Sequence, residues 1–266
     1  MDCFQLIREK DMEYLKFVLP GAWAVFSTRQ GGTSRPPFDT LNLAFHVGDE
    51  QESVAANREA FAAAVGFSLD RVVCANQVHG TNIQVVTQED CGRGAFRLED
   101  AVPETDALIT ADKGVILAGF FADCVPIYIS DPVKGAVALV HAGWKGTVKE
   151  IAGKTVGRMS GEFSCSPADC YALIGPSIGP CCYTVGKEVA AKFEFGPEGF
   201  DKAVKKQEDK WILDLWAANR NVLLSSGLLP ERIQLSGVCT RCGGKFFSYR
   251  GDGGCTGRMA AFIKPL

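Results

Sequence analysis

Residues 107–140 read ALITADKGVILAGFFADCVPIYISDPVKGAVALV, and this stretch decides the fold class. It contains four apolar runs separated by short polar or glycine-containing turns. These runs predict four successive β-strands, at residues 107–110, 115–121, 126–130 and 136–140. Continuous apolar runs of this kind are typical of strands that are buried on both faces.

Further strands and helices are predicted on both sides of this stretch. Similar runs predict strands at Ala22–Thr28, Arg71–Asn76, Asn82–Thr87, Tyr171–Ile174, Ile233–Val238, Phe246–Tyr249 and Met259–Ile263. Helical spacing and end signals predict helices at Glu50–Val65 (capped by Asp49 and ended by Gly66), 148–159, Glu188–Phe195 and Trp211–Ser226. Strands outnumber helices, so we expect an α/β or α+β fold with a large mixed sheet, forming one domain over residues 1–266. The polar, aperiodic segment Gln88–Glu104 is expected to be a flexible insertion.

The net charge and the lengths of the apolar stretches limit the cellular location and the kinds of partner that the protein can have. Lys and Arg number 28 against 31 Asp and Glu, and the net charge of −3 argues against a nucleic-acid surface. The N-terminal MDCFQLIREKDMEYL lacks the apolar core of a signal peptide. The apolar stretch Val115–Ala122 is far too short to span a membrane. We therefore expect a cytoplasmic protein without a membrane partner, in which thiols stay reduced.

Cysteine is abundant and histidine is scarce, with 11 Cys and 3 His in 266 residues. Most of these cysteines are expected to be small buried hydrophobic residues. The pattern Cys239-x-x-Cys242, with Cys255 beyond it and Cys181-Cys182 upstream, would suit a structural zinc site. Because a second pair with matching spacing is missing, incidental thiols are favoured there over a structural metal.

The three histidines and Cys124 lie at the ends of predicted strands, beside turn residues. His46 is in LNLAFHVGD, His79 in CANQVHGTN and His141 in AVALVHAGWKG, while Cys124 separates two strands in AGFFADCVPIYIS. Loops at strand ends admit ligands. Two imidazoles and one thiolate suit Zn²⁺, and three protein ligands plus water describe an open catalytic zinc. A structural hydrogen bond is the alternative for each histidine taken singly.

A series of motifs resembles the YfiH family, also called the laccase-domain or polyphenol-oxidase-like family. The resemblance runs over most of the chain, and the motifs are highly specific in order and combination. They are FSTRQGGTS at Phe26–Ser34, LNLAFHVGD at Leu41–Asp49, QVHG at Gln77–Gly80, TDALIT at Thr105–Thr110, ADCVPI at Ala122–Ile127, HAGWKGT at His141–Thr147, IGPSIGPCCYTV at Ile174–Val185 and FFSYRGDGGCTGR at Phe246–Arg258.

The resemblance implies both a fold and an activity. The implied fold is a YfiH/CNF-like α/β sandwich of mixed β-sheets covered by helices. The implied cofactor is a catalytic zinc held by His79, Cys124 and His141, the trio that metal chemistry also favours. Members of the family are described as phosphorolysing adenosine, inosine and methylthioadenosine and as deaminating adenosine, so purine nucleosides and phosphate are the implied partners. A copper polyphenol oxidase and an editor of a peptidoglycan precursor are further descriptions of the family.

Charged residues in these motifs are candidates for proton transfer and phosphate binding. Zinc deaminases use a carboxylate to move protons, and Asp106 or Asp123 would supply it. Each would equally serve as a turn or capping residue. Phosphorolysis needs a cationic pocket, for which Arg29, Lys145 and Arg250 are the candidates. Surface or sheet-edge salt bridges are the alternative for these three.

Two further residues have an open role. His46 is a candidate for substrate binding or proton transfer, with a structural hydrogen bond as the alternative. Trp144 would stack on a purine or pack in the core, and packing is favoured.

Three other functions remain open at this stage. Cys124, paired with His79 or His141, would be the nucleophile of a cysteine-type hydrolase or amidase acting on a peptidoglycan precursor. Copper-dependent phenol oxidation is disfavoured because three histidines cannot populate a multicopper cluster, so Zn²⁺ is expected rather than copper. A zinc-stabilised binding module without catalysis is the third. The sequence leaves the oligomeric state and the physiological substrate open.

Overall fold

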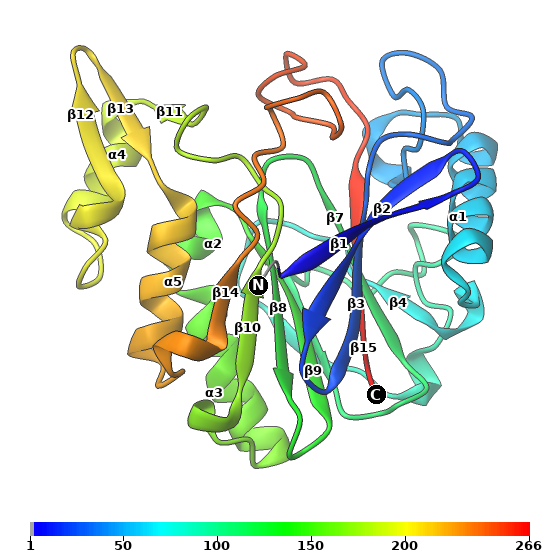
Figure 1. Ribbon diagram of the computed structural model, residues 1–266, viewed down its shortest axis with the longest axis horizontal. Coiled ribbons are helices and arrows are strands. Elements are labelled where there is room, and N and C mark those ends of the chain that lie inside the picture. The colour runs from blue at the N-terminus through cyan, green and yellow to red at the C-terminus, as the bar shows by residue number, and fades with distance from the viewer. Residues whose placement is uncertain (1–2) are drawn as a thin grey trace.

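Two six-stranded β-sheets lie face to face in the computed structural model of the protein, which describes residues 3–266 (Figure 1). The strand order of the first sheet is β1 (Phe4–Glu9), β2 (Met12–Leu19), β3 (Ala22–Ser27), β15 (Met259–Pro265), β7 (Ile116–Phe121) and β4 (Val72–Cys74). The order of the second sheet is β14 (Ile233–Leu235), β10 (Tyr171–Ile174), β8 (Val125–Asp131), β9 (Ala136–Ala142), β6 (Ala107–Thr110) and β5 (Ile83–Val85). Both sheets are mixed, because β4–β7, β5–β6 and β10–β14 are parallel pairs within otherwise antiparallel sheets.

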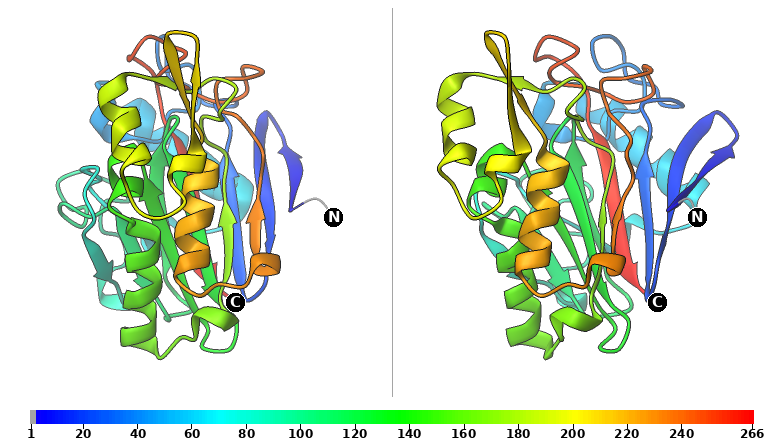
Figure 2. Two further views of the ribbon diagram at one scale, coloured as in Figure 1. Left: turned by 90° about the vertical axis from the view of Figure 1, so that its left-hand side faces the viewer. Right: turned by 60° about the vertical axis from the view of Figure 1, so that its left-hand side comes forward.

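Helices cover the outer faces of the two sheets (Figure 2). Helix α1 (Gln51–Val65) packs on the first sheet, with the ring of Phe61 stacked on that of Phe262 at 5.6 Å. Helices α3 (Ile151–Phe163) and α5 (Leu215–Ser225) share a buried core with the second sheet. This arrangement confirms the expected sandwich of mixed sheets covered by helices.

The remaining elements are short. A third sheet contains β11 (Thr184–Val185), β13 (Lys210–Leu213) and β12 (Val204–Gln207), next to helix α4 (Lys187–Glu194), and helix α2 (Trp144–Val148) precedes α3. Single 3₁₀ turns occupy Phe45–Val47, Leu69–Arg71, Gln88–Asp90, Pro167–Asp169, Asp201–Ala203 and Pro230–Arg232. Within residues 3–266, no helix has both the length and the apolar character needed to cross a membrane.

The side chains of β9 point alternately to the two faces of the second sheet. This alternation explains the continuous apolar run in the sequence and determines where His141 points. The even-numbered residues of Ala136–Ala142 face the helices, whereas Val137 and Leu139 face the first sheet. His141 continues the second series, so its ring points between the sheets and lies 5.5 Å from the ring of Phe121. Because both faces of β9 are covered, polar residues are confined to the end of the strand.

Some predicted elements are wrong. The helix predicted over Trp211–Ser226 begins only at Leu215, because Trp211 pairs with Val185 of β11 and Lys206 of β12. The strand predicted at Phe246–Tyr249 is an irregular segment. Strands β1 and β2 were not predicted.

The predicted cap of α1 is also wrong. Glu50 occupies the cap position without a side-chain bond, while Gly66 ends the helix as expected with φ of 84°. Asp49 Oδ1 accepts from the backbone N–H of Glu50 (2.9 Å), and Asp49 Oδ2 accepts from Ser34 Oγ (2.6 Å) and Asn42 Nδ2 (2.9 Å).

The segment Gln88–Glu104 is anchored by a buried cation, contrary to the expected flexibility. The Arg58 guanidinium donates to the carbonyl oxygens of Leu43 (2.7 Å), Gly94 (2.7 Å) and Ala95 (2.8 Å). Its charge also lies 4.5 Å from the centre of the Phe120 ring. Burial lowers the pKa of Arg58 to about 10, which leaves it protonated near neutral pH.

This anchor yields a stability prediction. Arg58→Met leaves the three carbonyl oxygens without their donor, so the free energy of unfolding should fall by about 3 kcal/mol in chemical denaturation. The matched control is Arg97→Met in the same segment. Arg97 forms an exposed ion pair with Asp100, and its loss should change the free energy by less than about 0.5 kcal/mol. Equal stability of the two variants would contradict the anchoring role.

Candidate functional site

Three potential metal ligands converge from three separate parts of the chain. His79 lies in the connection between β4 and β5, Cys124 lies between β7 and β8, and His141 belongs to β9. One ligand atom from each lies within 4.8 Å of those of the other two. The His79 Nε2 to Cys124 Sγ distance is 3.8 Å, close to the distance of about 3.5 Å between such atoms around tetrahedral zinc. The donor set and its spacing fit Zn²⁺.

The backbone around these residues directs their side chains inward. His79 and Asp123 have φ values of 59° and 85°, a left-handed conformation that is uncommon for residues other than glycine. Gly143 leaves the space that the ligands fill. A Cβ atom at Gly143 would lie 3.0 Å from Cys124 Sγ and 3.1 Å from His79 Cδ2. The centre is therefore crowded on the side of Gly143.

A buried carboxylate holds two of the three ligands in place. Asp106 accepts hydrogen bonds from the backbone N–H groups of Val78 (3.3 Å), His79 (2.9 Å) and Gly80 (2.6 Å), and it pairs with His141 Nδ1 at 2.8 Å. The bond to Nδ1 leaves Nε2 of His141 available to a metal. Carboxylates in this position orient metal-binding histidines.

The thiol and the imidazole at the centre shift each other's ionisation. Burial raises the pKa of Cys124, but the adjacent His141 and His79 outweigh burial and lower it to about 6. Burial lowers the pKa of His141, but Cys124 and the Asp106 carboxylate outweigh it and raise the pKa to about 9. The surroundings therefore favour the thiolate form of Cys124, which is the form that binds metal.

The three ligands lie in a cavity of about 510 Å³, a volume suited to a small organic ligand. The cavity also contains cationic and aromatic side chains, namely Lys145, Arg250 and Arg258 together with Phe120, Trp144, Tyr183 and Tyr249. Trp144 both packs against the core and lines the cavity.

His46 also lines this cavity, and its ring stays uncharged. Burial, followed by the positive charges of Arg258 and Arg58, lowers the pKa of His46 to about 4. Near neutral pH it therefore offers a neutral imidazole, able to accept or donate a hydrogen bond.

Two of the residues predicted from the sequence lie outside the set that lines the cavity. Asp106 lies behind the metal ligands, with both oxygens bonded as described. Arg29 forms ion pairs with Asp39 (3.3 Å) and Asp252 (3.8 Å) and lies over the ring of Phe247. Arg29 thus shows the salt-bridge arrangement that was the alternative to phosphate binding.

Asp123 lines the cavity, but its carboxylate is already engaged. Oδ1 accepts from Thr240 Oγ1 and Oδ2 accepts from the backbone N–H of Arg250, both at 2.7 Å. These bonds tie the loop after β7 to the loop after β14.

Sequence reasoning did not single out several residues that line the cavity. Gln77 holds Phe120 through two hydrogen bonds to its backbone, and Tyr183, Tyr249 and Arg258 form part of the wall. All four lie inside the motifs that carry the family resemblance. Position within a motif was therefore the signal that could have found them.

Known proteins resemble the chain over nearly its whole length. A family model described as "multi-copper polyphenol oxidoreductase laccase" matches residues 23–265. The purine nucleoside phosphorylase YlmD of Geobacillus stearothermophilus is 46% identical, over 91% of this chain and 90% of that protein. The protein of the same name from Bacillus subtilis is 43% identical, over 90% of this chain and 87% of that protein.

A solved structure agrees with these sequence matches. The crystal structure of the Bacillus licheniformis hypothetical protein YfiH superposes with a TM-score of 0.95 at 40% identity, and each chain is covered completely. Together, the family model, the relatives and the shared fold show that the chain belongs to the multi-copper polyphenol oxidoreductase laccase family, the YfiH or laccase-domain family that its motifs resemble.

Proposed function

We propose that the chain is a zinc-dependent purine nucleoside phosphorylase. The observation that carries the proposal is the convergence of His79, Cys124 and His141 in a cavity that also holds cationic and aromatic side chains. The names of the similar proteins support the same activity. The proposed substrates are adenosine, inosine and methylthioadenosine, together with inorganic phosphate.

The cavity offers cations that can receive phosphate. Lys145, Arg250 and Arg258 line it, and in the described residues 3–266 none of the three forms an ion pair with a carboxylate. Arg29 is neutralised by two carboxylates, so we assign the phosphate contacts to the other three. Phosphorolysis breaks the bond from C1′ of ribose to N9 of the purine and forms a bond from C1′ to an oxygen of hydrogen phosphate. The proton lost by the phosphate leaves with the purine base.

The ligands and their partners would set up the reaction. When bound, Zn²⁺ would act as a Lewis acid towards a substrate oxygen. Asp106 positions His141 through Nδ1, while Tyr183, Tyr249 and Trp144 provide aromatic surface for the purine. His46 is the group we assign to a hydrogen bond with the substrate, because its imidazole is neutral and Asp123 already uses both oxygens.

Deamination of adenosine is a second activity that we propose for the same site. Incubation of adenosine with and without phosphate separates the two reactions. Phosphorolysis needs phosphate and yields adenine and ribose 1-phosphate, whereas deamination consumes water and yields ammonia and inosine, which phosphorolysis would convert to hypoxanthine. Chromatography of the products then gives both rates on one preparation.

A cysteine-type hydrolase or amidase is a competing candidate, favoured by one arrangement. His141 lies between Cys124 and Asp106, as in the catalytic groups of such enzymes. Against the effect of burial, the thiolate of Cys124 raises the pKa of His141, and the charged imidazole of His141 lowers the pKa of Cys124. Metal analysis discriminates between the two candidates, since zinc bound through Cys124 at one equivalent leaves no thiolate to attack an amide. Hydrolysis of a peptidoglycan-precursor peptide that is fastest after zinc removal would favour the hydrolase.

Loss of a metal ligand should abolish phosphorolysis. His79→Asn removes the imidazole, yet Asn tolerates the left-handed φ of 59° at this position. We expect kcat/KM for adenosine and inosine to fall by about 100-fold or more, with one equivalent of zinc lost in elemental analysis. Circular dichroism and the thermal midpoint check the fold. Phosphorolysis at the full rate would overturn the catalytic metal.

Crowding at Gly143 gives a test that keeps all three ligands. Gly143→Ala places a methyl group against Cys124 and His79, and we expect the metal affinity to fall by at least about 10-fold in competition with a chelator. The control is Gly157→Ala in α3, where an added Cβ meets nothing within 4 Å. The control should keep its zinc and gain about 0.5–1 kcal/mol of stability.

The phosphate assignment predicts a selective change in KM. Lys145→Gln removes one cation from the cavity, so we expect KM for phosphate to rise about 10-fold while KM for the nucleoside changes little. Lys149→Gln is the control, because Lys149 is exposed at the end of the same helix and does not line the cavity. A rise in KM for the nucleoside alone would assign Lys145 to the nucleoside instead.

A further inference from the structure

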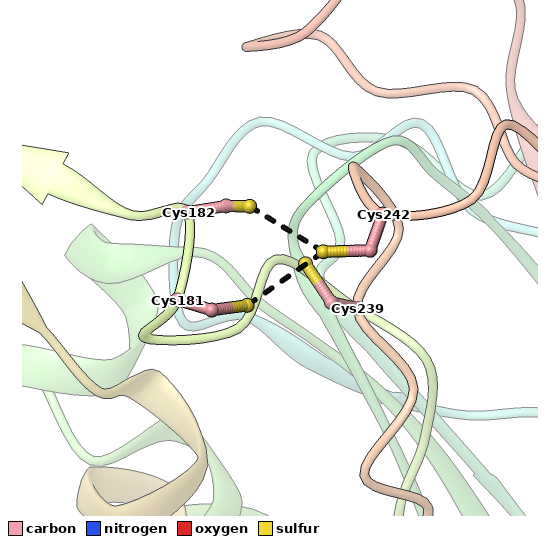
Figure 3. Close-up of side chains that lie close together, drawn as sticks. All are labelled: Cys181, Cys182, Cys239 and Cys242. Atoms are coloured by element: carbon pink, nitrogen blue, oxygen red, sulfur yellow. Dashed lines mark hydrogen bonds between the residues drawn. The ribbon is translucent and has the colours of Figure 1, made fainter.

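A second cluster of potential metal ligands lies outside the site described above. Cys181 and Cys182 belong to the segment after β10, whereas Cys239 and Cys242 follow β14. Figure 3 shows the four side chains meeting from the two segments, with their sulfur atoms towards one centre. All four sulfur atoms lie within 4.8 Å of one another, and all four residues are free thiols.

The distances between these sulfur atoms match those of a metal tetrahedron. Cys242 Sγ lies 3.8 Å from Cys181 Sγ and 3.6 Å from Cys182 Sγ. Four sulfur atoms at the Zn–S distance of about 2.3 Å from a tetrahedral zinc are separated by about 3.8 Å. The sulfur atoms of a disulfide are only about 2.05 Å apart. The spacing therefore suits a shared cation rather than a covalent pair.

The local backbone is arranged for thiolate ligands. Cys239 and Cys242 close a turn through the bond from the N–H of Cys242 to the carbonyl of Cys239 (3.3 Å), and Gly243 follows with φ of 80°. The backbone N–H of Gly179 donates to Cys239 Sγ at 3.3 Å. Such N–H donors stabilise negative charge on sulfur.

Glycine at position 179 also keeps the other pair close. A Cβ atom there would lie 2.7 Å from the Trp216 ring and 3.3 Å from Cys181 Sγ. Backbone N–H groups of Cys182 and Tyr183 both donate to the carbonyl of Gly179, at 2.9 and 3.0 Å. This tight turn presents both thiols of the adjacent cysteines to the same centre.

We propose that Cys181, Cys182, Cys239 and Cys242 form a structural zinc site that fastens together two segments of the cavity wall. Four thiols bind one Zn²⁺ and release four protons to solvent, which leaves a closed site with four sulfur ligands. Soft thiolate ligands in tetrahedral geometry select zinc over harder cations. Because all four positions are filled by protein, this site has no place for a substrate.

The proposed site has a clear structural purpose. Residues 239–258 contain no helix or strand, yet they supply Tyr249, Arg250 and Arg258 to the cavity. The segment after β10 supplies Tyr183 to the same cavity. Backbone bonds from Ser177 N–H to the carbonyl of Val238 (3.2 Å) and from Thr240 N–H to the carbonyl of Ser177 (3.1 Å) join the two segments just before the cysteines. Beyond them, Arg241 Nη1 donates to the carbonyl of Cys182 at 3.4 Å. A zinc ion would add four strong bonds at this junction.

Zinc counting tests the proposal without an activity assay, so its outcome is independent of the proposed catalysis. The full chain, purified under reducing conditions and desalted, should hold two zinc ions, measured by elemental mass spectrometry. The double variant Cys181→Ser/Cys242→Ser should hold one zinc ion, because the ion at the four cysteines is lost. The variant His79→Asn should also hold one, because the ion at His79, Cys124 and His141 is lost. Cys255→Ser is the matched control, an exposed cysteine of the same segment outside the cluster, and should keep two.

Cobalt substitution and thermal unfolding identify which site is lost. In the cobalt-substituted protein, the thiolate-to-cobalt absorption of Cys181→Ser/Cys242→Ser should be a minor fraction of that of the unaltered chain. In His79→Asn this absorption should fall only slightly. The thermal midpoint of the double variant should fall by several degrees while the Cys255→Ser midpoint is unchanged.

Several outcomes would overturn the proposal. The first is a full chain that holds a single zinc ion and loses it in His79→Asn. The second is iron in place of zinc at the four cysteines. The third is a protein mass lower by two hydrogens, which would mark a disulfide. If the double variant does not fold, stepwise release of zinc from the full chain by a mercurial reagent replaces it. Two zinc ions released in that titration support the site, as does one released from His79→Asn, and release of none from His79→Asn overturns it.

Discussion

The pairing of Asp106 is the interaction on which the site depends. A carboxylate buried in the interior is unfavourable unless its oxygen atoms are fully hydrogen-bonded. Asp106 meets this requirement with the three N–H groups of residues 78–80 and with the ring of His141. The first three bonds fix a left-handed turn that carries His79, and the last orients the ring of His141. One desolvated charge thereby sets the orientation of two ligands from distant parts of the chain.

The two-sheet architecture explains why the chemistry lies at strand ends. Strands covered on both faces bury mostly apolar side chains, and His141 and Cys124 lie where the chain leaves the sheet, at adjacent ends of β9 and β8. The rest of the cavity wall comes from Phe120 of β7, from the first residues of α2 and α5, and from loops near these ends. The potential metal ligands therefore lie at or just beyond strand ends, while β7, helix α2 and irregular segments supply the cationic and aromatic groups.

The sequence predicted local features well and long-range assemblies poorly. Strands 107–110 and 171–174 match the prediction because an apolar run between turn residues is a local signal. Trp211 was assigned to a helix because only its pairing with β11 and β12 makes it a strand residue. The same limit applies to Cys239 and Cys242, whose partners Cys181 and Cys182 lie about 60 residues earlier in the chain. The resemblance to a family pointed to His79, Cys124 and His141, whose side chains do converge, but it did not reveal that Arg29 is neutralised by Asp39 and Asp252.

The position of β15 has a consequence for how the chain is made. This strand, Met259–Pro265, lies in the middle of the first sheet between β3 and β7, whose residues are synthesised long before it. During translation the first sheet therefore has an open gap until residue 265 has left the ribosome, and two strand edges stay exposed for that time. Folding must then close contacts across almost the whole chain, which is intrinsically slow. A nascent protein of this fold thus depends on residues 259–265, and their removal deletes the centre of a sheet rather than its edge.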